Sequence, residues 1–219
     1  MSLPALRRRL LDRLSPVSAW SPDGAAARSD FDLNPGHDPS DIPLRPAAVL
    51  VPLIARPDGV QALMTRRADT LASHTGQIAF PGGRLDPGET AVEAALREAR
   101  EEIDLDPARV EVLGLGDAYR SGTGFLITPV VGWLAEPAPL RPSPAEVAEV
   151  FEAPWDFLMD PANHQRGSLE HEGMRRWFWA MPWRDRYIWG VTAGILRALR
   201  DRLYGDEADP LLAAEEDAA

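Results

Sequence analysis

The stretch from Gly82 to Leu105 limits the possible folds of this chain more than any other part of the sequence. It opens with two glycines and a Pro87-Gly88 turn. Thr90 is then a suitable helix N-cap, and Glu93 follows three residues later, as a capping box requires. Apolar residues repeat at helical spacing at Val92, Ala95, Leu96, Ala99 and Ile103. The sequence therefore predicts a glycine-rich loop that leads directly into an amphipathic helix over 90–103.

The end of this helix carries an unusual set of charges. Glu98, Glu101 and Glu102 stand at i, i+3 and i+4, so they share a face. Each like-charge pair at this spacing costs about 0.2–0.5 kcal/mol, and the helix dipole disfavours each carboxylate by about 0.3–1 kcal/mol. A divalent cation such as Mg²⁺ or Mn²⁺ would offset both costs, and Gly83 could bring a backbone oxygen to the same ion. A solvated acidic face is the alternative interpretation.

The composition excludes several kinds of chemistry. The 219 residues include no cysteine, which rules out disulfides, thiolate ligands and a cysteine nucleophile. They also include no lysine, which rules out Schiff-base and P-loop lysine chemistry. The net charge of -11 argues against a broad nucleic-acid-binding surface, although a metal ion or a few arginines can still bind a small phosphorylated molecule. No apolar run approaches the roughly 18 residues of a membrane span, so a cytoplasmic protein is expected.

Three segments are predicted along the chain. Residues 1–45 form an N-terminal helix, expected to pack on its own domain, followed by an irregular arm rich in Pro, Asp, Ser and Gly. Residues 46–205 form the main domain. Residues 206–219 form an acidic, flexible tail.

Strands and helices alternate within the main domain. The expected strands are 47–54, 60–65, 110–115, 125–134, 146–151 and 175–179. Besides the helix over 90–103, the expected helices are 155–159 and 188–203. The turn at 56–59 makes the first two strands a hairpin. Strands on both sides of a helix predict an α/β layered domain with a mixed central sheet.

The stretch from the double glycine onward resembles the Nudix signature. That signature reads Gly, five residues, Glu, seven residues, Arg-Glu, an aliphatic, any residue, Glu-Glu, any residue, Gly and an aliphatic. This chain supplies it with Gly83, Glu89, Arg97, Glu98, Ala99, Glu101, Glu102 and Leu105. Asp104 stands where the family has glycine. Because Asp tolerates left-handed conformations better than most residues, we expect the turn after the helix to form.

The resemblance implies a fold, an activity and a set of roles. It implies a Nudix-like α/β/α sandwich that hydrolyses a diphosphate bond with Mg²⁺ or Mn²⁺. Glu98 and Glu102 would ligate the metal, and Glu101 would be a further or water-mediated ligand. Arg97 would form a structural ion pair, for which Glu89 and Glu93 are the partners that the spacing offers.

Further segments are similar to coenzyme A pyrophosphatases, and the resemblance covers about residues 45–205. The similar segments are 63–67, 71–83, 146–151 and 189–193. The implied substrate is coenzyme A or a thioester of it, cut to 3′,5′-ADP and 4′-phosphopantetheine. Arg66, His74 and Gln77 are the candidate substrate contacts, with Arg66 preferred over Arg67, since a guanidinium fork suits phosphate. His74 is equally compatible with a structural role.

Two further roles remain open among several residues. Glu101, Glu146 and Glu149 are the candidates for the base that deprotonates or orients the attacking water. Tyr119, Phe125 and the Trp-rich segment 177–189 could stack on an adenine, although such aromatic residues more often belong to the core.

Three alternatives compete with coenzyme A hydrolysis. One is a Nudix enzyme of another specificity, such as ADP-ribose, NADH, dinucleoside polyphosphates or oxidised nucleotides. Another is a non-catalytic nucleotide-binding module of the same fold. A structural domain with an acidic helix face is disfavoured, because it leaves the register of loop and helix unexplained. The sequence also leaves open whether the protein is a homodimer.

Overall fold

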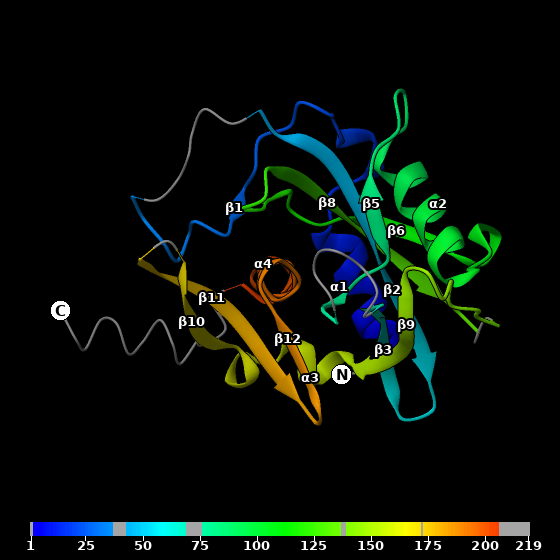
Figure 1. Ribbon diagram of the computed structural model, residues 1–219. Coiled ribbons are helices and arrows are strands. Elements are labelled where there is room, and N and C mark those ends of the chain that lie inside the picture. Colours follow the sequence, from blue (N-terminus) through cyan, green and yellow to red (C-terminus); the bar gives the residue numbers. More distant parts are fainter. Residues whose placement is uncertain (1, 37–42, 69–75, 137–138, 172, 206–219) are drawn as a thin grey trace.

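The computed structural model describes residues 2–36, 43–68, 76–136, 139–171 and 173–205. A mixed sheet lies at its centre, with helices on both faces and a second, smaller sheet beside it (Figure 1). The helices are α1 (Leu3–Arg13), α2 (Ala91–Ile103), α3 (Trp155–Met159) and α4 (Val191–Tyr204), with 3-10 turns η1 (Val17–Ala19), η2 (Pro107–Arg109) and η3 (Pro161–Asn163). The strands are β1 (Arg28–Ser29), β2 (Arg45–Arg56), β3 (Gly59–Arg67), β4 (Ile78–Ala79), β5 (Gly82–Arg84), β6 (Glu111–Leu115), β7 (Tyr119–Arg120), β8 (Phe125–Leu134), β9 (Val147–Pro154), β10 (Gln165–His171), β11 (Met174–Trp183) and β12 (Arg186–Trp189).

Strands β2 and β8 form the centre of the main sheet. They run parallel and pair from Arg45–Phe125 to Ile54–Leu134. Strands β1 and β7 are also parallel, whereas the other pairs of the main sheet are antiparallel. The β2–β3 hairpin closes where Arg56 pairs with Gly59, which confirms the predicted turn. The mixed sheet expected from the sequence is therefore confirmed.

Strands β2 and β3 separate after a short stretch of pairing. They are paired only from Leu53–Ala62 to Arg56–Gly59. Beyond that point β5 pairs with β2, and β4 pairs with β3, so the segment 76–84 fills the opening between the two strands. This arrangement brings the glycine-rich loop to the end of α2 that carries the glutamates.

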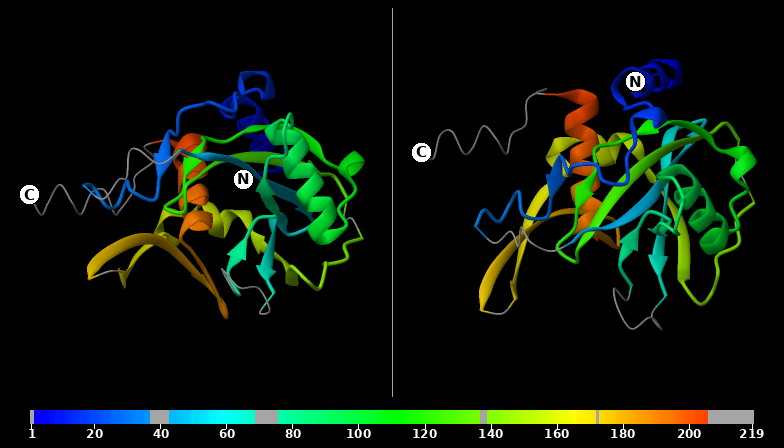
Figure 2. Two further views of the ribbon diagram at one scale, coloured as in Figure 1. Left: turned by 45° about the horizontal axis from the view of Figure 1, so that its top comes forward. Right: turned by 90° about the horizontal axis from the view of Figure 1, so that it is seen from above.

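The sheet separates two hydrophobic cores. Side chains of β2 alternate between them: Leu50 and Ile54 face the α2 side, and Val51 and Leu53 face the opposite side. Helices α1, α3 and α4 cover that opposite side, and α2 alone covers its own side (Figures 1 and 2). The predicted α/β/α sandwich is thus confirmed.

The second sheet, in the order β10-β11-β12, differs from the expectation for the C-terminal part. The last helix was expected from Ile188, but Ile188 and Trp189 belong to β12, and α4 begins at Val191. Gly190 separates strand from helix with a φ of 63°. Ile188 is buried because its side chain points from β12 toward the core. In the sequence it therefore looks like the first apolar residue of the helix that follows. Strand β10 was missed because its sequence is mostly polar.

The N-terminal helix packs on the domain, as expected. Leu6 and Leu10 are buried in the core that contains α4. Arg202 of α4 also donates a hydrogen bond of 2.7 Å to the carbonyl of Arg13. Within the described ranges no helix combines the length and hydrophobicity that crossing a membrane requires. The predicted tail over 206–219 lies outside the described residues.

Alanines form the buried face of α2. Ala94, Ala95 and Ala99 are fully buried, whereas Val92 and Leu96 of the predicted stripe are only half-buried at its edge. The sequence pattern missed Ala94 because alanine contributes little to a hydrophobic stripe. Small side chains let α2 lie close to the sheet.

Replacing one of these alanines by a larger residue should therefore destabilise the protein. We expect Ala94→Leu to lower the free energy of unfolding by about 1–3 kcal/mol, because the closely packed interface has no room for the added atoms. Urea unfolding monitored by tryptophan fluorescence measures this. Ala108→Leu, at an exposed position of η2, makes the same change as a control. Equal stability of the two variants would contradict the account of this interface.

Candidate functional site

Local interactions fix both ends of α2. The Thr90 hydroxyl accepts a hydrogen bond of 3.3 Å from the backbone N–H of Glu93, and the Glu93 carboxylate accepts one of 2.8 Å from the N–H of Thr90. The predicted capping box is therefore present. Asp104 caps the other end with φ 56° and ψ 32°, the left-handed conformation expected of it. Glu93 is thus engaged at the cap and does not contact Arg97, for which the spacing had offered it as a partner.

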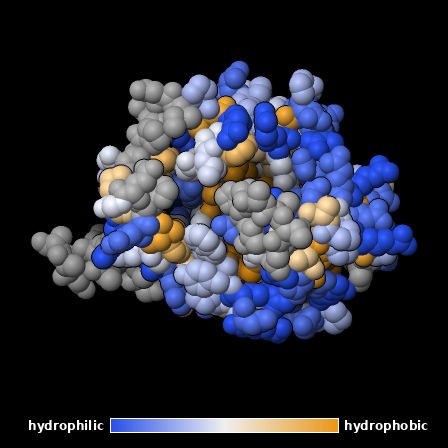
Figure 3. All heavy atoms as spheres, viewed as in Figure 1, coloured by the Kyte–Doolittle hydropathy of each residue, from blue (hydrophilic) through white to orange (hydrophobic). Residues whose placement is uncertain are grey.

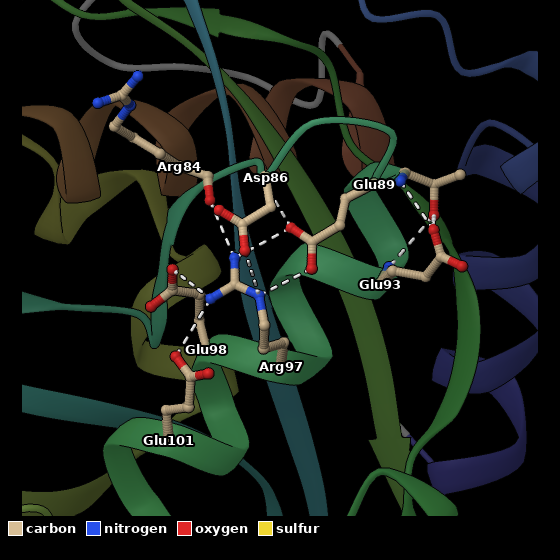
Figure 4. A network of polar contacts seen from close by, with 8 residues as sticks. Arg84, Asp86, Glu89, Glu93, Arg97, Glu98 and Glu101 are labelled. Carbon is tan, nitrogen blue, oxygen red and sulfur yellow. Dashed lines mark hydrogen bonds and ion pairs between the residues drawn. The ribbon is translucent and has the colours of Figure 1, made fainter.

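Arg97 is the centre of a polar network that joins the loop to the helix (Figure 4). Its Nε donates to Glu89 at 2.7 Å, and a terminal nitrogen donates to the Arg84 carbonyl at 3.0 Å. The other terminal nitrogen donates to Glu98 at 3.0 Å and to Glu101 at 3.1 Å. The hydrogen bond to Glu89 contributes most to a pKa of Arg97 above its usual value. The guanidinium therefore holds two carboxylates that would otherwise repel each other.

Glu102 lies deeper than the other glutamates of the helix end. Its relative exposure is 5%. Burial, together with the charges of Glu98 and Glu146, raises the pKa of Glu102 to about 8, although Arg67 and a hydrogen bond from the N–H of Gly82 act in the opposite direction. Burial also raises the pKa of Glu98. The half-buried Glu98 thus disfavours ionisation of the buried Glu102, which makes this pair electrostatically costly.

The two glycines of the loop leave space for this pair. A Cβ at position 83 would lie 2.3 Å from Oε1 of Glu98, and a Cβ at position 82 would lie 2.4 Å from the carbonyl oxygen of Ala48. Any side chain at Gly83 would therefore displace the Glu98 carboxylate. A side chain at Gly82 would push the loop away from β2.

This arrangement fits a hard divalent cation. Such ions take oxygen ligands; the carboxylate of Glu98 lies against Gly83, and that of Glu102 accepts a hydrogen bond from the N–H of Gly82. A cation between these groups would offset the cost of their burial. As they lie, no three Asp, Glu or His side chains in the described part of the chain form a ready-made metal site. Glu98 and Glu101 instead contact Arg97.

A cavity of about 770 Å³ opens beside the glutamates. Glu102, the two glycines and Arg67 line one end of it, strand β11 lines the other, and the N-terminus of α4 lies between them, where Thr192 bonds to the carbonyl of Ile78 (Figure 1). Figure 3 shows apolar side chains in this hollow, between the β10–β11 hairpin and the main sheet. Its volume lies within the range of small-molecule sites.

The candidate substrate contacts are not all placed alike. Arg66, the preferred candidate, does not line the cavity and forms an ion pair with Glu149 at 3.8 Å. Arg67 lines the cavity instead, on the same face of β3 as Thr65, because successive side chains of a strand point to opposite faces of the sheet. Gln77 also lines the cavity. His74 lies outside the described residues.

The three candidate bases differ in their surroundings. Glu101 is exposed and bonded to Arg97. Glu149 forms an ion pair with Arg186. Glu146 is exposed, and its charge raises the pKa of both Glu98 and Glu102, so it faces the buried pair.

Most of the candidate aromatic residues meet at the cavity. Its lining includes Tyr119, Phe125, Trp177, Trp179 and Trp189. Trp183 is instead buried against Phe151, with the ring centroids 6.0 Å apart. Residues of the N-terminal arm, including Asp30 and Asn34, also line the cavity. Nothing in the local sequence of the arm indicated this position.

Comparison with known proteins gives a consistent family. A family model described as the NUDIX domain matches residues 44–178. A protein named "Uncharacterized Nudix hydrolase NudL" from Cronobacter sakazakii is 40% identical over 168 residues, which are 76% of this chain and 87% of that protein. Its namesake from Escherichia coli strain K12 is 40% identical over 156 residues, 71% of this chain and 81% of that protein. Among solved structures, a C. elegans Ap4A hydrolase has a TM-score of 0.45 at 20% identity, covering 50% of this chain and 80% of its own.

The raised pKa of Glu102 predicts a pH-dependent stability. Glutamate has an ordinary pKa of 4.5, against about 8 for Glu102 in the folded protein. Between these values the folded state binds more protons than the unfolded state, so the free energy of unfolding falls as the pH rises. In EDTA we expect Glu102→Gln to exceed the parent in stability by about 2–4 kcal/mol at pH 8 and to lose this advantage toward pH 4.5. Urea unfolding at several pH values tests this.

Glu101→Gln is the control for the loss of a neighbouring, exposed carboxylate. It should not reproduce the pH-dependent gain. A constant difference between Glu102→Gln and the parent from pH 5 to pH 8 would show that Glu102 ionises normally in the folded protein.

Proposed function

Because this chain belongs to the Nudix hydrolase family, we propose that it hydrolyses the diphosphate bond of coenzyme A or of a coenzyme A thioester. The products would be 3′,5′-ADP and 4′-phosphopantetheine or its acyl derivative. The family consists of pyrophosphohydrolases that act on nucleoside-diphosphate-linked substrates. The observation that carries the proposal is the buried Glu98–Glu102 pair beside a cavity of about 770 Å³ lined by aromatic residues.

Nudix hydrolases generally use a divalent cation, typically Mg²⁺. In this chain Glu98 and Glu102 would hold it, with Glu101 and Gly83 as further ligands, and Mn²⁺ is an alternative ion. The raised pKa values of Glu98 and Glu102 support this assignment, because the cost of burying the two carboxylates exceeds what Arg97, Arg67 and the N–H of Gly82 offset. When bound, the cation would supply Lewis-acid polarisation of the phosphate oxygens and neutralise developing charge.

The reaction adds one water across the P–O–P link. The water oxygen bonds to one phosphorus, the bridging P–O bond breaks, and each product keeps one phosphate. Arg67 lies at the cavity wall near Glu102, so its guanidinium can bind the diphosphate. Arg97 orients Glu98 and Glu101 by donating hydrogen bonds to their carboxylates. Arg66 forms an ion pair with Glu149, and this proposal assigns it no contact with the substrate.

Glu146 is the base that we propose. Its charge acts on both Glu98 and Glu102, which supports a position of its carboxylate close to the proposed cation site. The carboxylates of Glu149 and Glu101, in contrast, are each engaged in an ion pair with an arginine. Glu146 would take the proton that the attacking water loses.

The choice of coenzyme A rests on segments 63–67 and 71–83, and on the cavity. Part of the first segment contributes Thr65 and Arg67 to the cavity wall, and part of the second contributes Gln77 to the same wall. A long cavity with both apolar and cationic residues suits a nucleotide with an extended second group.

Product analysis tests the proposal directly. Purified protein with Mg²⁺ or Mn²⁺ should release 3′,5′-ADP and 4′-phosphopantetheine from coenzyme A, as measured by mass spectrometry. EDTA should abolish the release. We expect Glu102→Gln to lower kcat/KM by about 1000-fold, because loss of cation contacts removes several kcal/mol of transition-state stabilisation.

The control is Glu111→Gln, which removes a surface carboxylate bonded to Arg7 far from the cavity, and it should retain activity. ADP-ribose, NADH, Ap4A and oxidised dGTP are assayed alongside. Turnover of one of these without coenzyme A would replace the substrate proposed. Nucleotide binding without turnover of any would indicate a non-catalytic module.

A matched pair of variants tests the base. Glu146→Gln should lower kcat by about 100-fold or more with little change in KM, because general-base catalysis typically contributes that much. Glu149→Gln, on the same strand region but bonded to Arg186, should lower kcat far less. Rates are measured from pH 6 to pH 10. A larger loss of kcat in Glu149→Gln than in Glu146→Gln would reverse the assignment.

A further inference from the structure

The cavity has a second end, formed at an open edge of β11. Strand β12 pairs with β11 from Ala180 to Trp183, and the N–H of Gly190 bonds to the carbonyl of Trp179, so β12 leaves that edge of β11 uncovered before Trp179. Asn34 of the N-terminal arm occupies this edge. Its Nδ2 donates to the Trp177 carbonyl at 2.9 Å, and its Oδ1 accepts from the Trp177 N–H at 2.8 Å. The amide side chain thus replaces a neighbouring strand at this position.

The arm that carries Asn34 is itself firmly attached. Asp30 accepts hydrogen bonds from the hydroxyl of Tyr119 at 2.8 Å and from the N–H of Gly122 at 2.7 Å. Nδ2 of Asn34 also donates to the carbonyl of Asp30 at 2.9 Å. Asn34 is 6% exposed, so these contacts are protected from water. The arm therefore forms a fixed wall at this end of the cavity.

Arg176 is the cationic residue of this end. It lines the cavity, and its Nε is buried without a hydrogen-bond partner in the described part of the protein. A guanidinium nitrogen taken out of water without a partner is unfavourable, and a phosphate oxygen would satisfy it. Arg97 and Arg202 differ from it, because the Nε of each donates a hydrogen bond and each is also paired with a carboxylate.

Three arginines line the cavity, and they belong to different parts of it: Arg84 follows Gly83 of the glycine-rich loop. Arg67 lies beside Glu102, where the diphosphate would be cut, and Arg176 lies on β11. Aromatic rings line the β11 end, and the ring of Trp177 is the most exposed among them at 40%. A ligand that matches this pattern carries a diphosphate, an aromatic base and a separate phosphate.

We propose that the β11 end of the cavity binds the nucleoside part of the substrate together with its separate phosphate monoester. Arg176 contacts the phosphate, and Trp177 stacks on the base. Asn34 is the positioning residue, because its bonds to the backbone of Trp177 hold this part of β11, and with it both side chains, in place. This inference rests on the proposed function and deepens it. In coenzyme A the phosphate concerned is the one on the 3′ oxygen of the ribose.

Coenzyme A and 3′-dephospho-coenzyme A differ only by this phosphate, so their comparison tests the inference. We expect the parent protein to show a kcat/KM for coenzyme A about 10- to 100-fold above that for the dephosphorylated compound. In Arg176→Met the ratio should fall close to one, through a higher KM for coenzyme A with little change in kcat. The KM for dephospho-coenzyme A should hardly change.

Arg175→Met is the matched control for the phosphate contact, since Arg175 precedes Arg176 on the same strand, is exposed and does not line the cavity. Its guanidinium lies 5.9 Å from the centre of the Trp177 ring, so any effect through that ring would change the KM of both compounds together. This variant should keep the ratio of the parent.

Trp177→Leu should raise the KM of both compounds equally. Asn34→Ala should lower the ratio as Arg176→Met does, and Asn34→Asp, which keeps the acceptor only, should give an intermediate ratio.

The outcomes separate the inference from the proposed function. Equal kcat/KM values for the two compounds in the parent would overturn the phosphate subsite and leave coenzyme A hydrolysis intact. So would an unchanged ratio in Arg176→Met, with circular dichroism used to verify folding. Failure to hydrolyse either compound would instead reject the proposed function. A fall of the ratio in Arg175→Met alone would move the phosphate contact to that residue.

Discussion

The hydrogen bonds of Arg97 are the interaction on which the site depends. They join Glu89 and the Arg84 carbonyl of the loop to Glu98 and Glu101 of α2. Loop and helix are adjacent in sequence, and this guanidinium fixes the distance between them together with the hydrogen bond from the N–H of Gly82 to Glu102. It also separates two carboxylates that lie one turn apart on a helix end where the dipole already disfavours them. Arg97 thereby makes a concentration of negative charge compatible with folding.

The same packing that builds the core makes the acidic pair unusual. The alanine face of α2 lies close to the sheet. Gly82 and Gly83 allow the loop to lie against β2 and against the carboxylate of Glu98. Glu102 is consequently buried, and its pKa rises to about 8. The packing of the core therefore also determines the electrostatics of the site. An enlarged residue at either surface would change both.

The cavity is assembled from parts that are far apart in the chain. The divergence of β2 and β3 admits the loop, β3 contributes Arg67, and the second sheet supplies aromatic rings. The N-terminal arm completes the enclosure through Asn34, which bonds to a residue 143 positions away. The contribution of the arm explains why an irregular, polar segment can belong to the binding site. Its side chains provide the hydrogen bonds that a strand would otherwise provide.

The sequence by itself determined the features that depend on local spacing. The capping box at Thr90, the left-handed Asp104 and the shared face of Glu98, Glu101 and Glu102 follow from the periodicity of one helix. The hairpin at 56–59 and the parallel pairing inside a mixed sheet were also within reach of pattern and turn chemistry. Tertiary structure alone decided that Arg67 rather than Arg66 meets the cavity, and that the arm covers β11. These depend on strand register and long-range hydrogen bonds, which neighbouring residues do not encode.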